Sequence, residues 1–140
     1  MREILFRGKR RDNGEWIEGS LMKITRNENE CAESFYLIFQ DNFSFKGTLV
    51  KSEGHAVVDP ETTGQYTRVR DEHLKPLFEG DICRAKNLLH NGKEELFSVE
   101  WYANGFYFVD DTGTPWHPHH LEDIENIGNI HDNPELLGGA

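Results

Sequence analysis

The chain has 140 residues, with 15 Lys and Arg against 25 Asp and Glu, which gives a formal net charge of −10. This length suits one domain or two small subdomains, and no apolar run approaches the roughly 18 residues of a membrane span. We therefore expect neither a membrane-spanning segment nor an export signal. Residues 71–140 hold 14 of the acids and only 4 of the bases, which disfavours general binding to nucleic acid because like charges repel.

Residues 1–58 are predicted to form an N-terminal β subdomain. An Asp-Asn-Gly sequence at 12–14 favours a hairpin turn, since Asn and Gly tolerate positive φ. The strand that returns from this turn is expected to be interrupted at Gly19. A continuous apolar run at 35–39 has the length of a strand buried on both faces. The predicted strands lie, in chain order, at 4–6, 16–24, 35–39, 43–45 and 55–58.

Residues 59–76 are predicted to be a connector, because Pro60 and Gly64 favour turns and the charge shift falls near its end. Residues 77–140 then show short strands separated by tight turns, which is typical of an SH3-like barrel. The sequence Asn-Pro-Glu at 133–135 favours the start of a short C-terminal helix. The overall expectation is a mainly β protein with two small β subdomains, the C-terminal one being the SH3-like barrel.

Four groups of residues could carry chemistry or recognition. Cys31 and Cys83 have no CxxC spacing, so two reduced thiols are expected, with a disulfide or a metal pair as alternatives. The run Trp-His-Pro-His-His at 116–120 offers imidazoles for a metal ion. On a regular strand or helix, however, the adjacent His119 and His120 would point in different directions. An exposed polar loop is therefore favoured over a metal site or acid–base work, and no cofactor is expected.

A basic run lies at residues 7–11, where Arg7, Lys9, Arg10 and Arg11 place four positive charges beside the first turn. It could hold phosphates, although no aromatic residue is interleaved with it. A solvated strand end is favoured. Local contact with nucleic acid, or with the acidic half of the same chain, remains the alternative.

Aromatic residues gather on one predicted hairpin between residues 101 and 108. Because side chains alternate along a strand, about half of them point outward, and exposed aromatic residues commonly form a recognition surface. Core filling explains most of the group. Trp101, Tyr102 and Tyr107 are the candidates for an interaction surface.

Four segments of the sequence are distinctive. They are Met-Arg-Glu-Ile-Leu-Phe-Arg at residues 1–7, Asp-Pro-Glu-Thr-Thr-Gly-Gln-Tyr-Thr at 59–67, Glu-Gly-Asp-Ile at 79–82 and Ile-Gly-Asn-Ile-His-Asp-Asn-Pro-Glu-Leu at 127–136. These segments resemble motifs of the YopX family of phage and prophage proteins. The Asp-x-Asn-Gly turn of the relatives is missing at 71–76. The resemblance implies a cytoplasmic, β-rich protein encoded by a phage in a bacterial host, with no assigned activity.

Binding is the expected function. The sequence contains no Walker A, G-x-G-x-x-G, G-x-S-x-G or H-E-x-x-H motif, so a non-enzymatic accessory protein is favoured. The expected partner is a protein, either a host or phage protein or a second copy of the chain. The alternatives are a nucleic-acid-associated factor that uses residues 7–11 and a metal-dependent hydrolase that uses His117 and its neighbours up to His120.

Overall fold

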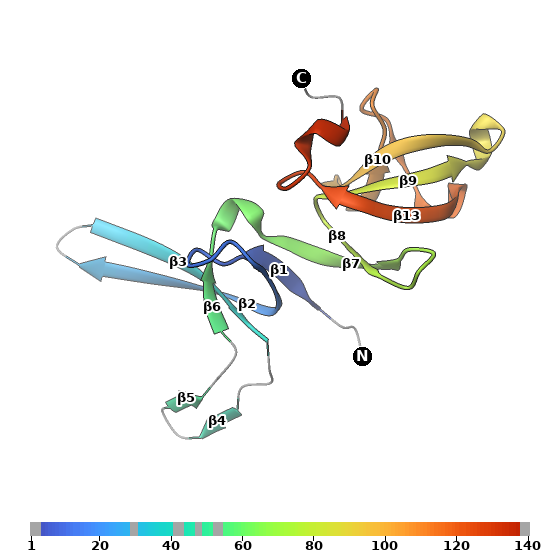
Figure 1. Ribbon diagram of the computed structural model, residues 1–140. Coiled ribbons are helices and arrows are strands. Elements are labelled where there is room, and N and C mark those ends of the chain that lie inside the picture. The colour runs from blue at the N-terminus through green and yellow to red at the C-terminus, as the bar shows by residue number, and fades with distance from the viewer. Residues whose placement is uncertain (1–3, 29–30, 41–43, 47–48, 52–54, 138–140) are drawn as a thin grey trace. The chain divides into compact units, whose positions relative to one another are not determined.

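The computed structural model describes residues 4–28, 31–40, 44–46, 49–51 and 55–137, and within them the protein is mainly β (Figure 1). The chain divides into two compact units, Met1–Gln65 and Tyr66–Ala140, which we call unit 1 and unit 2. The described segments contain strands and short 3-10 turns but no α-helix. No helix in that part of the chain is long and apolar enough to cross a membrane.

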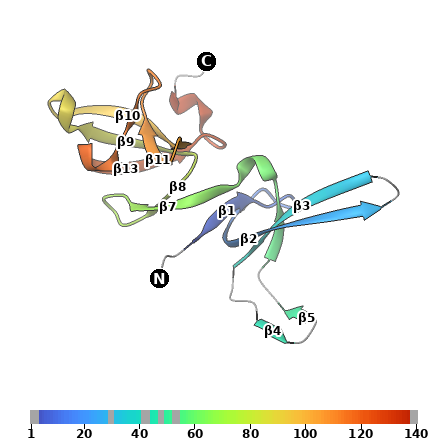
Figure 2. The same cartoon turned by 180° about the vertical axis from the view of Figure 1, so that it is seen from behind.

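Six strands form an antiparallel sheet in the order β6-β3-β2-β1-β7-β8. A long hairpin of β2 and β3 is its most extended part, as the view in Figure 2 shows. β7 runs through the boundary between the two units. The strand bounds are Phe6–Lys9 for β1, Trp16–Glu28 for β2, Cys31–Phe39 for β3, His55–Val58 for β6, Gly64–Arg70 for β7 and Pro76–Phe78 for β8, while Ser44–Lys46 (β4) and Leu49–Lys51 (β5) form a separate pair.

The expected interruption at Gly19 is wrong, because β2 continues through it. A Cβ atom at Gly19 would overlap the backbone carbonyl of Phe39, so this glycine permits a close approach of two chain segments. The small core of unit 1 consists of Ile17, Ile38, Ala56 and Val58. The short strands near it are thus held by one compact apolar cluster.

The segment after β6 contains regular structure. A 3-10 turn at Pro60–Thr62 (η1) begins at Asp59, whose carboxylate accepts a hydrogen bond from the Glu61 amide. The Asp59 amide donates to the Lys9 carbonyl over 2.8 Å, and the Lys9 amide donates to the Thr62 hydroxyl over 2.8 Å. These bonds attach η1 to β1.

Unit 2 contains a five-stranded antiparallel sheet in the order β12-β11-β10-β9-β13. Its core includes Leu77, Cys83, Phe97, Val99 and Phe108. The strands are Asp81–Asn87 for β9, Lys93–Tyr102 for β10, Gly105–Val109 for β11, Pro115–Trp116 for β12 and Leu121–Asn129 for β13. The 3-10 turns are Leu88–His90 (η2), Pro118–His120 (η3) and Pro134–Leu137 (η4).

Two finer expectations for unit 2 are not confirmed. Among the described strands β12 and β13 do not pair, so the hydrogen-bonded sheet is not a closed barrel. The expected C-terminal helix takes the form of a single 3-10 turn at Pro134–Leu137. So short a segment has too few backbone hydrogen bonds to sustain an α-helix alone.

The turn at 71–76 is built without an Asn-Gly pair. The buried Asp71 carboxylate accepts hydrogen bonds from the amides of His73 and Lys75 over 2.9 Å each, and from the Asn126 amide over 3.1 Å. Leu74 takes the left-handed conformation, with φ of 63°. Desolvation would raise the pKa of Asp71, but the hydrogen bonds outweigh it and lower the pKa below its ordinary value.

Candidate functional site

The β10–β11 hairpin presents two different faces. Its register pairs Glu100 with Tyr107 and Trp101 with Phe106. Because side chains alternate along each strand, Phe97, Val99 and Phe108 point into the core. Leu96, Ser98, Glu100 and Tyr102 of β10, with Tyr107 and Val109 of β11, therefore share the opposite face, which we call the outer face.

Tyr102 and Tyr107 meet at one end of the outer face. Their ring centroids are 6.2 Å apart in an edge-to-face arrangement, and the Tyr107 ring lies 6.1 Å from that of His117. The Tyr107 hydroxyl donates to the Asn104 side chain over 3.2 Å. Tyr102 is 49% exposed. We call Tyr102, Tyr107 and His117 the aromatic strip.

Trp101 does not join the aromatic strip. It packs edge-to-face against Phe106, with centroids 5.0 Å apart, on the face that carries the core further along the hairpin. It is nevertheless 56% exposed, because the core ends before the tip of the hairpin. The three aromatic candidates therefore lie at one hairpin tip but on two of its faces.

The histidine loop folds more tightly than the sequence suggested. His117 is the N-cap of η3, and the 3-10 turn brings the ring centroids of His117 and His119 to 4.2 Å and those of His119 and His120 to 3.9 Å. The expectation that adjacent imidazoles diverge assumed a regular strand or helix. Among the described residues, however, no group of three or more His, Cys, Asp or Glu side chains could hold a metal ion.

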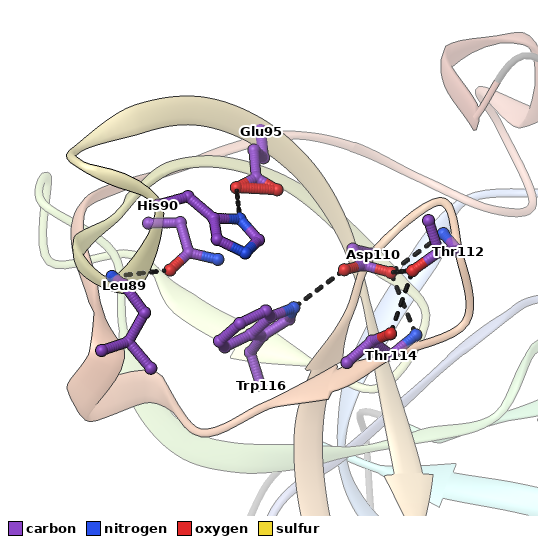
Figure 3. Close-up of polar contacts among 8 residues, drawn as sticks. Leu89, His90, Glu95, Asp110, Thr112, Thr114 and Trp116 are labelled. Atoms are coloured by element: carbon purple, nitrogen blue, oxygen red, sulfur yellow. Dashed lines mark hydrogen bonds and ion pairs between the residues drawn. The ribbon is translucent and has the colours of Figure 1, made fainter.

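A polar network near Trp116 was not predicted from the sequence (Figure 3). The Asp110 carboxylate accepts hydrogen bonds from the Thr112 and Thr114 amides and from the Trp116 indole over 2.9–3.0 Å. On the other side of the indole lies His90, 5.0 Å away edge-to-face. His90 in turn contacts Glu95 over 2.6 Å. The only sequence signals were the turns at 90–93 and 110–113, which indicate loops but no pairing.

A groove of about 640 Å³ opens on unit 2 at the other end of the outer face. Leu96, Ser98 and Val109 of the outer face line it, together with Leu136 and Leu137 of η4. Its remaining lining residues are charged: Lys93, Glu94, Glu95, Asp110 and Asp111. This groove could not be predicted from the sequence, because it depends on where the terminal turn folds.

The basic run is largely engaged by other side chains. The Arg7 guanidinium carbon lies 4.6 Å from the Trp16 ring centroid and the Lys9 ammonium 5.5 Å from it. β1 pairs with β2 in a register that places Lys9 opposite Trp16, so pairing supplies the aromatic residue that the run lacks. Arg10 donates two hydrogen bonds to Asp12, over 2.9 and 2.7 Å.

Arg11 and the two cysteines complete the predicted positions. The Arg11 side chain is exposed and helps to line a groove of about 450 Å³ with Arg10 and His55. Cys83 is a buried thiol in the unit 2 core. The side chain of Cys31 lies outside the part of the structure that is described.

The fold and the sequence both have relatives. The chain is similar to the crystal structure of protein EF1440 from Enterococcus faecalis, with 21% identity over 98% of this chain and 99% of that one and a TM-score of 0.60. At this identity the likeness shows the fold alone. A comparison with curated proteins gave no match. Residues 5–138 match the family described as YopX protein, and the chain therefore belongs to the YopX family.

Proposed function

We propose that this protein acts by binding another protein through the aromatic strip of unit 2. The observation that carries the proposal is the outward placement of Tyr102 beside Tyr107, on the face of the hairpin opposite the core. Tyr side chains are enriched at protein interfaces, since they bury a large apolar area and keep a polar group for hydrogen bonding. Exposed rings that pack against one another are pre-organised, which lowers the entropy lost on binding.

The surrounding charge favours a basic partner. Glu100 is exposed and lies opposite Tyr107 in the register of the hairpin. Residues 71–140 carry the acidic excess of the chain. Tyr rings also attract Lys and Arg through cation–π contacts, which act in the same direction as the carboxylates. The proposed role is that of a phage- or prophage-encoded accessory protein in the bacterial cytoplasm.

Self-association is the second form of this proposal, in which the protein works as a homo-oligomer. The aromatic strip would then meet a surface of another copy that is less acidic than its own surroundings. The sequence of unit 1 provides the nearly neutral surface that such an arrangement requires.

We also propose that unit 2 is a small barrel of the SH3-like kind. β13 returns to pair with β9, so the last strand of the sheet lies beside the first. Residues 117–120 are all that separates β12 from β13 in the chain, which keeps the two edge strands close. Nuclear Overhauser contacts between the backbones of β12 and β13 would support this assignment, and their absence would contradict it.

The test of binding is a pull-down from infected or lysogenic cells with the wild-type protein and two variants. Tyr102→Ala removes an exposed ring of the aromatic strip. Leu89→Ala is the matched control, because Leu89 is 61% exposed on a different turn. The captured protein is then purified, and its affinity for each variant is measured by calorimetry.

Tyr102→Ala should weaken that affinity by about tenfold or more, the range of an interface hot spot, while Leu89→Ala should leave it nearly unchanged. Equal affinity for all three proteins would show that the aromatic strip is not the binding surface. Size-exclusion chromatography of the same variants identifies the homo-oligomer: there, Tyr102→Ala would shift the protein to a smaller species.

A further inference from the structure

The groove at the far end of the outer face combines an apolar floor with an acidic rim. Leu96, Leu136, Leu137 and Val109 supply apolar surface, and Leu96 and Leu137 are 37% and 43% exposed. Its volume of about 640 Å³ lies in the range of ligand-binding pockets, which is roughly 300–1,000 Å³. The floor therefore has room for an apolar side chain that would otherwise be in water.

The rim carries four carboxylates against one ammonium group. Two of the carboxylates already have partners, since Asp110 accepts from Trp116 and Glu95 contacts His90. Asp111 has no hydrogen bond or ion pair within the described residues, and Glu94 has no hydrogen bond there. Asp111 is therefore available to an incoming cation. Glu94 also attracts cations, but it already interacts electrostatically with Arg84 and Lys86 of β9, and Lys93 offsets a further part of the negative charge.

The outer face of β10 leads from the groove to the aromatic strip. Leu96, Ser98, Glu100 and Tyr102 follow one another on the outer face of β10, and the Ser98 hydroxyl donates to the Glu100 carboxylate over 2.8 Å. At about 3.3 Å per residue, the path from Leu96 to Tyr102 is roughly 20 Å long. An extended peptide of about six residues would span it, with alternate side chains pointing toward the sheet.

We propose that the groove binds an extended basic segment of a partner protein, with an apolar side chain on the leucine floor and Lys or Arg side chains at Glu94 and Asp111. This rests on the proposed function in taking the outer face as the binding surface, and it adds the chemical class of the partner. A second copy of unit 2 on the groove is disfavoured, because it would bring two acidic faces together. A polyamine would satisfy the carboxylates but leave the leucines in water.

The experiment is a selection from a random peptide display library on the full-length protein. Enriched sequences should combine Leu, Ile, Val or Phe with Lys or Arg. The most enriched peptide is then synthesised, labelled with fluorescein, and titrated with protein by fluorescence anisotropy at low and high salt. Its affinity should fall as salt rises, because the contacts with the rim are screened.

Two groove variants and one control locate the bound peptide. The double variant Glu94→Gln and Asp111→Asn should weaken binding by about fivefold, as expected for two exposed ion pairs. Leu96→Ser should weaken it by about tenfold through loss of apolar contact. The control, Glu18→Gln with Glu122→Gln, changes the net charge equally at residues that do not line the groove, and it should retain the wild-type affinity.

Enrichment of acidic or purely apolar peptides, or an equal loss of affinity in the control, would overturn the proposal. Complete displacement of the peptide by spermidine at equal charge concentration would also overturn the proposal. So would a dimer that dissociates in the Leu96→Ser variant, because the groove would then bind a second copy of the chain. Failure of the groove proposal can be distinguished from failure of the proposed function, because Tyr102→Ala tests the aromatic strip separately. If Tyr102→Ala alone abolishes partner capture and the groove variants do not, the proposed function stands and this inference fails.

Discussion

At the scale of single residues, Asp110 makes the most informative set of contacts. Desolvation would raise its pKa, but hydrogen bonds from the Thr112 hydroxyl, the Trp116 indole and the Thr114 amide outweigh that effect. Together they lower the pKa from 3.8 to about 2. One carboxylate thus closes the turn after β11 and holds the Trp116 indole of β12, which packs against the core.

We predict that Asp110→Asn lowers the free energy of unfolding by about 1–2 kcal/mol at neutral pH, since a charged acceptor is replaced by a neutral one. A depressed pKa stabilises the fold above the unfolded value of 3.8 and ceases to do so as the pH falls toward about 2. The difference between the two proteins should therefore shrink across that window. Urea titrations at several pH values measure it. Asp111→Asn is the control and should change stability by less than about 0.5 kcal/mol. A difference independent of pH would refute the charged role of Asp110.

A second residue-scale prediction concerns Gly19. Replacement by Ala would drive the new Cβ into the Phe39 carbonyl, so β2 or the chain at the end of β3 must shift. We expect a loss of about 2 kcal/mol or more, in the range of overpacked sites. Gly105→Ala is the control, since its Cβ would meet the nearest side-chain atom at 3.7 Å, an ordinary contact. Equal thermal stability of the two variants would contradict this explanation of Gly19.

At the scale of elements, the strands with strict alternation were the most predictable. The alternation of Phe97, Val99 and Trp101 indicated β10, and the turns around it were visible as Asn-Gly pairs. Gly19 was misread as a break, because a glycine that admits a neighbouring carbonyl looks the same in sequence as one that ends a strand. The groove and the His90–Trp116–Asp110 network could not be predicted, since each joins residues from separate turns whose placement depends on the whole unit.

Hydrogen bonds of Asn129, the last residue of β13, hold the terminal turn to unit 2. The Asn129 side-chain oxygen accepts from the amides of His131 and Asp132, and the Asn129 side-chain nitrogen donates to the Asp132 carboxylate over 3.1 Å. The Asn133 amide donates to the Asn129 carbonyl over 2.8 Å, and the Asn133 side chain accepts from the Asn129 amide over 3.3 Å. The Asn-Ile-His-Asp-Asn-Pro signature at 129–134 therefore encodes a turn.

We predict that a chain ending at His131 melts several degrees lower than the intact protein. It loses the hydrogen bonds of Asp132 and Asn133, worth about 1 kcal/mol each, and the partial burial of Leu136. Scanning calorimetry measures the change. Leu137→Ala, at an exposed position, is the control and should melt like the wild type. If the truncated chain also melts like the wild type, the tail is a free motif for an outside partner and not part of the fold.

At the scale of the whole molecule, the residues that the structure describes form two separate apolar clusters. Ile38 and its neighbours form the cluster of unit 1, whereas Val99 and its neighbours form that of unit 2. Each cluster consists of residues from one unit only. Since apolar burial is the main stabilising contribution to folding, each unit has its own source of cooperativity.

The last prediction follows from this division. Ile38→Ala and Val99→Ala each remove apolar atoms from a side chain that is 0% or 1% exposed, and each should cost roughly 2–4 kcal/mol. Native-state hydrogen exchange, read by mass spectrometry on peptides, reports the opening free energy of each strand. Ile38→Ala should lower protection in β2 and β3 and leave β9 and β10 unchanged, while Val99→Ala should do the reverse. β7 passes through both units and is the segment that could couple them. If either variant lowers protection equally in both units, the chain unfolds as one cooperative body, and two separate clusters do not make two folding units.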